Sequence, residues 1–223
     1  MISLSRSCLY AASGLLPVAL VLSTGEPART GPNGHFHPAD FPNAVLRTHE
    51  GKEVRFKDDL LKGKVAVLNF FYTRCEGVCP GTVKNLLEVQ RILGDRVGRD
   101  LFLYSITLRP EEDTPERMRA YAEGIGAGPG WLFLTGEPDV VEGLRRGLGF
   151  VDPDPEVDKD KSQHVGMVLY GNEARQSWAA CPGGSSPELM AEQILWMLPQ
   201  AEAEAAGGGP KDRGLPSLQG GTK

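Results

Sequence analysis

Two stretches of the chain are apolar at nearly every position, as expected for strands buried on both faces of a sheet. They cover residues 65–72 and 101–107. Between them, Val83, Leu86 and Val89 recur at helical spacing after Pro80, a residue that the first turn of a helix tolerates. The pattern therefore predicts a buried strand, a helix and a second buried strand in succession.

The rest of the pattern extends this alternation. Residues 165–170 and 176–180 predict a hairpin that turns at Gly171-Asn172. Three dipeptides that end in proline are predicted helix starts: Thr114-Pro115, Glu137-Pro138 and Ser186-Pro187. The predicted order is β-α-β-α-α-β-β-α over a domain spanning residues 40–199. Such an order favours an α/β fold, a thioredoxin-like mixed sheet flanked by helices on both faces.

Both ends of the chain differ from this domain. Arg6 precedes a mostly apolar run over residues 9–22, which predicts a signal peptide or N-terminal anchor within residues 1–25. Residues 26–39 are rich in Pro, Gly and Asn and predict a linker, whereas residues 200–223 predict a disordered tail. We therefore expect an exported protein that works in an oxidising compartment such as the periplasm.

The net charge and the number of cysteines limit the classes of function that the chain can have. The net charge of −5 gives no reason to expect nucleic-acid binding, and no glycine-rich phosphate loop is evident. Of four cysteines, removal of the leader deletes Cys8 and leaves Cys75, Cys79 and Cys181. An odd number argues against a disulfide framework and favours a close pair with one spare thiol.

The close pair, Cys75 and Cys79, lies where the first buried strand gives way to the predicted helix. Helix N-termini favour thiolate over thiol, and thiolates serve both metal binding and disulfide exchange. Two sulfurs one helical turn apart could share a copper ion or close as a disulfide. Because Gly77 places the pair in a turn, we disfavour the alternative of two small core residues.

His164 is the next candidate ligand, because it precedes a predicted strand. In a thioredoxin-like sheet, the loop before that strand faces the cysteine loop. Two thiolates and an imidazole suit Cu(I) and can also hold Cu(II). A structural zinc site would require a fourth protein ligand.

The other candidates have simpler interpretations. His35 and His37 form a His-x-His pair in the linker and are expected to be solvated, with a secondary copper contact as the alternative. His49 is expected on the surface, Met167 in the core, and Cys181 as a passive buried thiol.

An acidic segment precedes His164. Because its prolines interrupt regular structure, we expect a solvated loop rather than a site for a hard cation. The acidic residues are Asp152, Asp154, Glu156, Asp158 and Asp160.

Several motifs together resemble the Sco/SenC family of copper-binding, thioredoxin-like assembly factors. Residues 71–80 (FYTRCEGVCP) are similar to the family's Phe-Thr-x-Cys-x-x-x-Cys-Pro segment, and residues 105–115 (SITLRPEEDTP) to its Ser-x-Asp-Pro-x-x-Asp-Thr-Pro segment. Residues 134–136 match a Leu-Thr-Gly of the family, and His164 falls where the family has its histidine ligand.

This resemblance implies one copper ion held by Cys75, Cys79 and His164. It also implies a metallochaperone rather than an enzyme, one that delivers copper to a terminal cytochrome oxidase, reduces the cysteines of its copper centre, or does both. The implied partners are the copper-containing oxidase subunit and a thiol reductase. Residues 1–25 would supply a membrane tether at the extracytoplasmic face.

Two departures from the family pattern remove negative charge near the expected site. Arg109 and Gln163 stand where the family often has Asp. We expect them to affect partner recognition and redox tuning more than metal ligation.

Two other functions stay open. A thiol–disulfide oxidoreductase without a metal is one, although thioredoxins use Cys-x-x-Cys opposite a cis-proline, and this chain has a longer spacing and Gln163-His164 there. A redox or copper sensor is the other.

Overall fold

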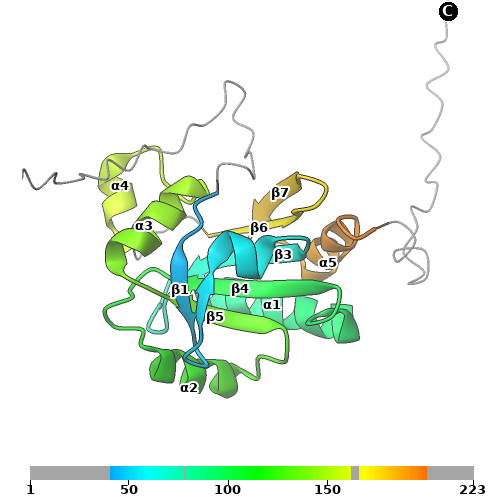
Figure 1. The fold of residues 1–223 in the computed structure, drawn as a ribbon, viewed down its shortest axis with the longest axis horizontal. Helices are drawn as coiled ribbons and strands as arrows, with labels where there is room; N and C mark the ends of the chain where they lie inside the picture. The colour runs from blue at the N-terminus through cyan, green and yellow to red at the C-terminus, as the bar shows by residue number, and fades with distance from the viewer. Residues whose placement is uncertain (1–40, 78, 162–165, 200–223) are drawn as a thin grey trace, which may run out of the picture.

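The computed structural model describes residues 41–77, 79–161 and 166–199. A seven-stranded sheet with the order β2-β1-β5-β4-β3-β6-β7 forms the centre of the molecule (Figure 1). Its strands are β1 Val45–Thr48, β2 Glu53–Arg55, β3 Val65–Phe71, β4 Leu101–Thr107, β5 Trp131–Thr135, β6 Met167–Asn172 and β7 Ser177–Pro182. The helices are α1 Cys79–Leu93, α2 Pro115–Ile125, α3 Pro138–Gly147, α4 Pro155–Lys159 and α5 Pro187–Leu195, with a π-helix at Phe56–Leu61 and a 3₁₀ turn at Gly94–Arg96.

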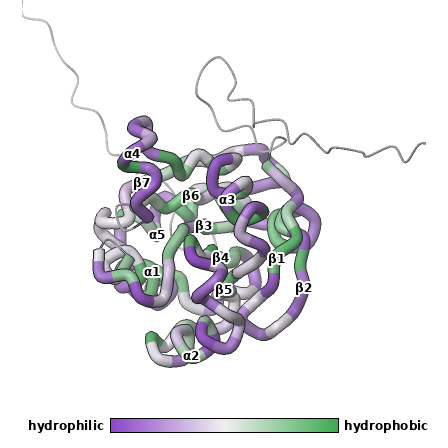
Figure 2. The backbone as a smooth tube through the Cα atoms, turned by 90° about the vertical axis from the view of Figure 1, so that its left-hand side faces the viewer, coloured by the Kyte–Doolittle hydropathy of each residue, from purple (hydrophilic) through white to green (hydrophobic). Residues whose placement is uncertain are grey.

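The sheet is mixed, as the sequence predicted. β3 pairs in parallel with β4 and antiparallel with β6, while β4 pairs in parallel with β5. α1 and α5 pack together on one face of the sheet, and α3 lies on the other (Figure 2). The predicted α/β architecture, with helices on both faces, is confirmed. Within the described ranges, no helix is both long and apolar enough to span a bilayer.

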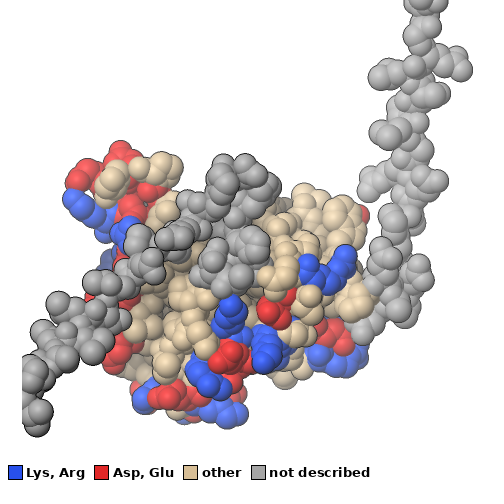
Figure 3. Space-filling view, turned by 45° about the horizontal axis from the view of Figure 1, so that its top comes forward, with Lys and Arg blue, Asp and Glu red and all other residues tan. Residues whose placement is uncertain are grey.

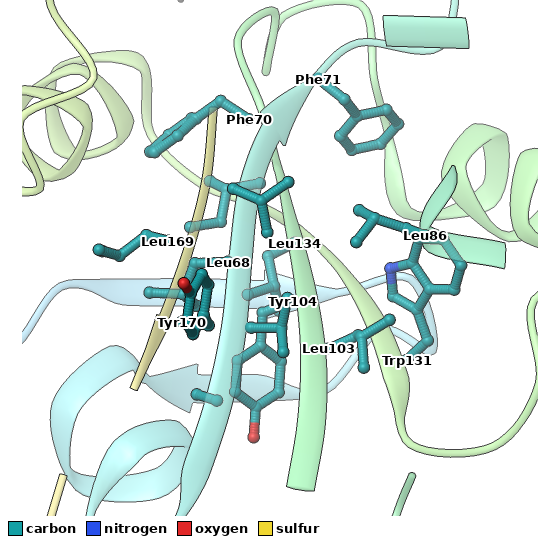
Figure 4. Close-up of a cluster of buried hydrophobic side chains, with 14 of the residues drawn as sticks. Leu68, Phe70, Phe71, Leu86, Leu103, Tyr104, Trp131, Leu134, Leu169 and Tyr170 are labelled. Carbon is teal, nitrogen blue, oxygen red and sulfur yellow. The ribbon is translucent and has the colours of Figure 1, made fainter. Parts of the chain in front are cut away.

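β3 runs through the middle of the core and is buried at all its positions. Phe70 and Phe71 point to opposite sides of the strand, with Phe71 on the side of Leu86 and Trp131 (Figure 4). The Phe70 ring packs 4.8 Å from the ring of Phe150, measured between centroids. Because β3 is buried at every position, solvent does not reach its side chains. A reactive group on this segment is therefore expected after the strand ends.

The predicted helix starts are confirmed. Thr114 and Ser186 cap α2 and α5, because their hydroxyls accept hydrogen bonds from Arg117 N–H (3.3 Å) and Leu189 N–H (3.2 Å). Glu137 precedes Pro138 at the start of α3 but makes no side-chain cap hydrogen bond.

The predicted turn of the late hairpin is wrong. Gly171 and Asn172 belong to β6, and the chain turns over residues 173–176. Gly171 faces Trp178 across the ladder, and a Cβ atom there would lie 2.4 Å from the indole. Gly171 therefore allows the Trp178 side chain to lie close to the backbone of β6, and it does not form a turn.

The acidic segment is also more ordered than predicted. Residues 155–159 form α4, and the Asp158 side chain is only 9% exposed. Its two oxygens accept hydrogen bonds of 2.7 Å from both terminal nitrogens of the buried Arg145 guanidinium, which also binds Glu142 at 2.7 Å. Charged side chains of both signs gather at this corner of the molecule (Figure 3). The segment is held by a buried ion pair, a partner that lies too far away in the sequence for local patterns to predict.

The same ion pairs depress carboxyl pKa values. Hydrogen bonds from Arg145 lower the pKa of Asp158 below its usual range and that of Glu142 to about 2. A carboxyl whose pKa is lower in the folded than in the unfolded state stabilises the fold above its unfolded pKa. That stabilisation is lost as the pH falls through the folded value.

We expect Asp158→Asn to reduce the free energy of unfolding at pH 7 by about 2–4 kcal/mol, because it leaves Arg145 buried beside a neutral partner. The difference from wild type should shrink as the pH falls from about 4 to 2. Urea unfolding at pH 7, 5 and 3 measures it. Glu156→Gln, which changes an exposed pair with Lys159, is the matched control and should cost less than about 1 kcal/mol. A difference that does not depend on pH would contradict the ion-pair account.

Candidate metal centre

The two cysteines of the close pair lie at the end of β3. Residues 72–75 form a turn in which the N–H of Cys75 donates to the carbonyl of Tyr72 at 3.2 Å. Cys75 is half-buried, and Cys79 is the first residue of α1 and only 2% exposed. Both are free thiols. The predicted strand-to-helix placement of the pair is confirmed.

The predicted effect of the helix N-terminus on Cys79 is wrong. Burial raises the pKa of the Cys79 thiol, and the neighbouring Cys75 sulfur raises it further. Backbone N–H groups of Tyr72 and of Cys79 itself act in the opposite direction, but their effect is smaller than that of burial. Desolvation therefore outweighs the helix dipole here and disfavours the thiolate form of Cys79.

Asp113 anchors the cysteine turn. Its carboxylate, 1% exposed, accepts hydrogen bonds from the Thr73 N–H (3.1 Å), the Thr73 hydroxyl (2.5 Å) and the Thr107 hydroxyl (2.6 Å). Thr107 ends β4, so one carboxylate ties the turn after β3 to the neighbouring strand. The sequence interpretation had missed this residue, although it lies in the Asp113-Thr114-Pro115 part of the second family-like segment.

Two tyrosines border the pair. Burial raises the pKa of Tyr72 to about 12, and the neighbouring Cys75 side chain contributes to the increase. Burial also raises the pKa of Tyr121 to about 12, with smaller contributions from the two cysteines. Its ring packs 5.5 Å from that of Phe71. The pair thus lies against a largely apolar wall that limits the access of water.

Three of the predicted histidines, His35, His37 and His164, lie outside the described residues. Among the residues that the structure does describe, no three His, Cys, Asp or Glu side chains gather as a metal site. The described centre therefore consists of the two thiols.

His49 is the remaining histidine, and it lies in the turn between β1 and β2 with its side chain more buried than predicted. The ring is half-buried against Phe133, with 5.7 Å between ring centroids, and its Nδ1 accepts the Phe133 N–H at 3.2 Å. Burial lowers its pKa. His49 is a structural residue that joins the β1–β2 turn to β5.

Cys181 lies on β7, apart from the close pair in the fold. It is 8% exposed, and its Cα partner across the ladder is Val168. Burial raises the pKa of its thiol, which agrees with the passive role predicted for it. Met167, on β6, packs against the core as predicted.

We expect Asp113→Ala to destabilise the fold by about 2–4 kcal/mol, since it removes the acceptor of three hydrogen bonds, one of them from the buried Thr107 hydroxyl. It should also speed alkylation of Cys79 by iodoacetamide at least severalfold, because the turn that covers the thiol loses its anchor. Mass spectrometry of timed samples measures both cysteines separately. The exposed Glu111 supplies the control, Glu111→Gln, which should leave the labelling rate unchanged. Equal labelling of Cys79 in Asp113→Ala and wild type would show that the carboxylate does not hold the turn.

Solved structures with this fold include several Sco proteins. The copper-bound structure of ScoI from Bradyrhizobium japonicum superposes with a TM-score of 0.57 at 25% identity, covering 70% of this chain and 97% of that one. A structure of BsSco, described as a member of the Sco family of cytochrome c oxidase assembly proteins with a disulfide switch, gives a TM-score of 0.55 at 21% identity, covering 69% and 90%. These likenesses confirm the thioredoxin-like fold.

Proteins that are similar to this chain in sequence are also named as SCO proteins. The SCO1 protein homolog of Bacillus subtilis (strain 168) is 28% identical over 166 residues, covering 73% of this chain and 82% of the relative. The match to the SCO2-like protein of Rickettsia felis is 29% identical over 89 residues, covering 40% of this chain and 42% of that protein. The SCO1/SenC family model matches residues 43–199, a range that contains every helix and strand described above. This chain therefore belongs to the SCO1/SenC family.

Proposed function

We propose that the chain is a copper-binding assembly factor that delivers copper to the copper centre of a terminal cytochrome oxidase, reduces the cysteines of that centre, or does both. The observation that carries the proposal is the pair of free thiols of Cys75 and Cys79 at the end of β3. The copper-bound ScoI of Bradyrhizobium japonicum, a relative of the same fold, supports copper as the metal.

The residues fit copper by their chemistry. Soft thiolates favour Cu(I) over hard cations such as Mg²⁺ and Ca²⁺, and the described residues offer no carboxylate cluster beside the pair. Cys75 is partly accessible, so a metal can reach the site from solvent. Cys79 has to lose its proton when it binds the metal, and binding therefore releases protons.

We propose His164 as the third ligand. β6 runs antiparallel to β3, with Asn69 opposite Val168. The chain therefore enters β6 at the edge of the sheet where β3 leads into the cysteine turn. Gly166 and Met167, where the described chain resumes before β6, lie at this end of the sheet, which supports the proposal. Two thiolates and one imidazole would then complete a three-coordinate Cu(I) site.

The partner and the compartment are parts of the same proposal. The partner is the copper-containing subunit of a terminal oxidase, and BsSco, a protein of the same fold, is described as an oxidase assembly protein. The apolar run in residues 9–22 supports export or a membrane tether at the extracytoplasmic face.

A metal-free thiol–disulfide oxidoreductase is the second candidate. The placement of the two thiols favours it, because Cys75 and Cys79 are both free and lie within one turn between β3 and α1, a separation at which a disulfide can form. Reduction of a partner disulfide would pass two electrons and two protons from Cys75 and Cys79 to the partner and leave a Cys75–Cys79 disulfide.

The reduced full-length chain should bind one Cu(I) in an anaerobic titration against a chromogenic chelator. We expect Cys75→Ala and Cys79→Ala to lose this binding, because each removes a thiolate ligand. His164→Ala should weaken it by about tenfold or more and change the sulfur-to-Cu(II) charge-transfer band. Cys181→Ala is the matched control, since it removes a buried thiol outside the site, and should bind copper as wild type does.

Unchanged copper stoichiometry in both close-pair variants would refute the ligand assignment. If the wild-type chain retains no copper but reduces a disulfide substrate, the oxidoreductase is the correct function. Delivery and reduction are separated by mixing the copper-loaded chain with a metal-free oxidase copper domain, either reduced or oxidised. Transfer to the reduced domain indicates delivery, whereas new thiols in the oxidised domain indicate reduction.

A further inference from the structure

β7 is an edge strand that carries no charged side chain. It ends the strand order of the sheet and, in the part of the chain that the structure describes, pairs with β6 alone (Figure 1). Its six residues, Ser177–Pro182, read SWAACP. β2, at the opposite edge, has three residues and carries Glu53 and Arg55. Short or charged edges resist further pairing, whereas longer uncharged edges favour it. Of the two edges, β7 is therefore the one suited to accept another strand.

The ladder between β6 and β7 determines which backbone groups of β7 face outward. The N–H of Gly183 donates to the carbonyl of Gly166 at 2.7 Å, so these two residues form a hydrogen-bonded pair. Hydrogen-bonded and non-hydrogen-bonded pairs alternate along an antiparallel ladder. In the register of β7, Cys181 and Ala179 therefore also bond to β6 through their backbone groups.

The backbone groups of Trp178 and Ala180 consequently point away from β6. Within residues 41–77, 79–161 and 166–199, no hydrogen bond satisfies these groups. Ala180 is exposed and Trp178 is partly exposed. Each chain thus presents two N–H donors and two C=O acceptors along an open strand edge, and backbone groups of this kind favour pairing with another strand.

The last helix adds exposed apolar surface on the same side of the molecule. Leu189 is 47% exposed, and Trp196, directly after α5, is 58% exposed. Leu189, Gln193 and Trp196 follow one another at spacings of four and three residues, so they share one helical face. The Tyr170 hydroxyl of β6 donates to Gln193 Oε1 at 2.9 Å, which turns this face toward the β6–β7 end of the sheet.

A second copy of this chain fits the open edge. A two-fold axis brings a surface against its own counterpart, so like charges on it would repel, and β7 carries none. With the axis at Ala179, Trp178 would lie opposite the partner's Ala180, and the two strands would exchange four hydrogen bonds. The donors and acceptors of the two copies match in number, so none of the four outward groups of either strand stays unsatisfied.

We infer that β7 is a self-association edge, at which two copies of the chain pair their β7 strands antiparallel and extend the sheet across a dimer. Leu189 and Trp196 would supply the apolar surface beside the paired strands. The inference goes beyond the proposed function and does not depend on it, because no residue of this edge belongs to the thiol pair and no metal takes part.

Sedimentation velocity of the full-length chain from micromolar to near-millimolar concentrations measures the association. The samples hold no metal, and a phosphine reductant keeps the cysteines as thiols so that no disulfide links two copies. We expect a reversible equilibrium between monomer and dimer.

Two substitutions of Ala180 test the edge itself. Ala180→Pro removes an outward N–H from each copy and leaves the bonds to β6 in place. It should raise the dimer dissociation constant by about tenfold or more, because two of the four hydrogen bonds are lost. Ala180→Lys keeps the backbone N–H, so it serves even where proline disturbs the fold, and its charge should weaken the dimer to a similar extent. Val45→Lys is the matched control, since Val45 is 49% exposed on the inner strand β1, and should leave the constant unchanged.

Amide hydrogen exchange, followed by NMR, locates the contact. The amides of Trp178 and Ala180 should exchange fast in the dilute monomer and slowly where the dimer forms. Those of Ala179 and Cys181, which bond to β6, should stay protected at both concentrations.

A chain that stays monomeric at every concentration would overturn the inference. Protected Trp178 and Ala180 amides in such a monomer would show that another segment of the same chain covers the edge. A dimer that Ala180→Lys leaves intact would also overturn it, because the copies would then associate through a different surface, such as the apolar run in residues 9–22.

Discussion

The geometry of the centre depends on how Asp113 satisfies the chain at the end of β3. Once β3 leaves the core, its backbone loses the neighbouring strands that satisfied it, and the turn needs other partners. The buried carboxylate supplies them by accepting hydrogen bonds from Thr73 and Thr107. Because Thr107 belongs to β4, the turn is fixed relative to the sheet and not merely to itself. Cys75, two residues after Thr73, takes its position from this anchor.

The sequence was most informative where local pattern and tertiary environment agree. β3 and β4 are uniformly buried, so composition alone indicated them, and the Pro-containing starts of α2, α3 and α5 need no distant partner. Sequence reasoning failed where a distant residue decides the outcome. Gly171 was predicted in a turn, but in the fold it lies in a strand and Trp178 fills the space beside it. Asp158 was predicted in a solvated loop, but in the fold it pairs with the buried Arg145.

The same distinction separates the parts of the centre. The positions of Cys75 and Cys79 followed from their spacing and from the strand before them. The protonation of Cys79 did not, because burial by the surrounding core outweighs the helix N-terminus that sequence alone reveals. Asp113 and Tyr72 were also missed, since neither residue type has a distinctive spacing. Their roles arise from side chains that converge only after β3 and β4 have paired.

The position of β3 in the sheet has a consequence for the order of folding. Val65 pairs with Leu101 on one side and with Asn172 on the other, so the central strand acquires its second neighbour only after most of the domain has been synthesised. Pairings between such distant segments form slowly. Cys75 and Cys79 follow this strand directly, and they stay accessible in the nascent chain until the sheet closes around β3. In an oxidising compartment, this thiol pair would be exposed to premature oxidation for as long as the last strands are missing.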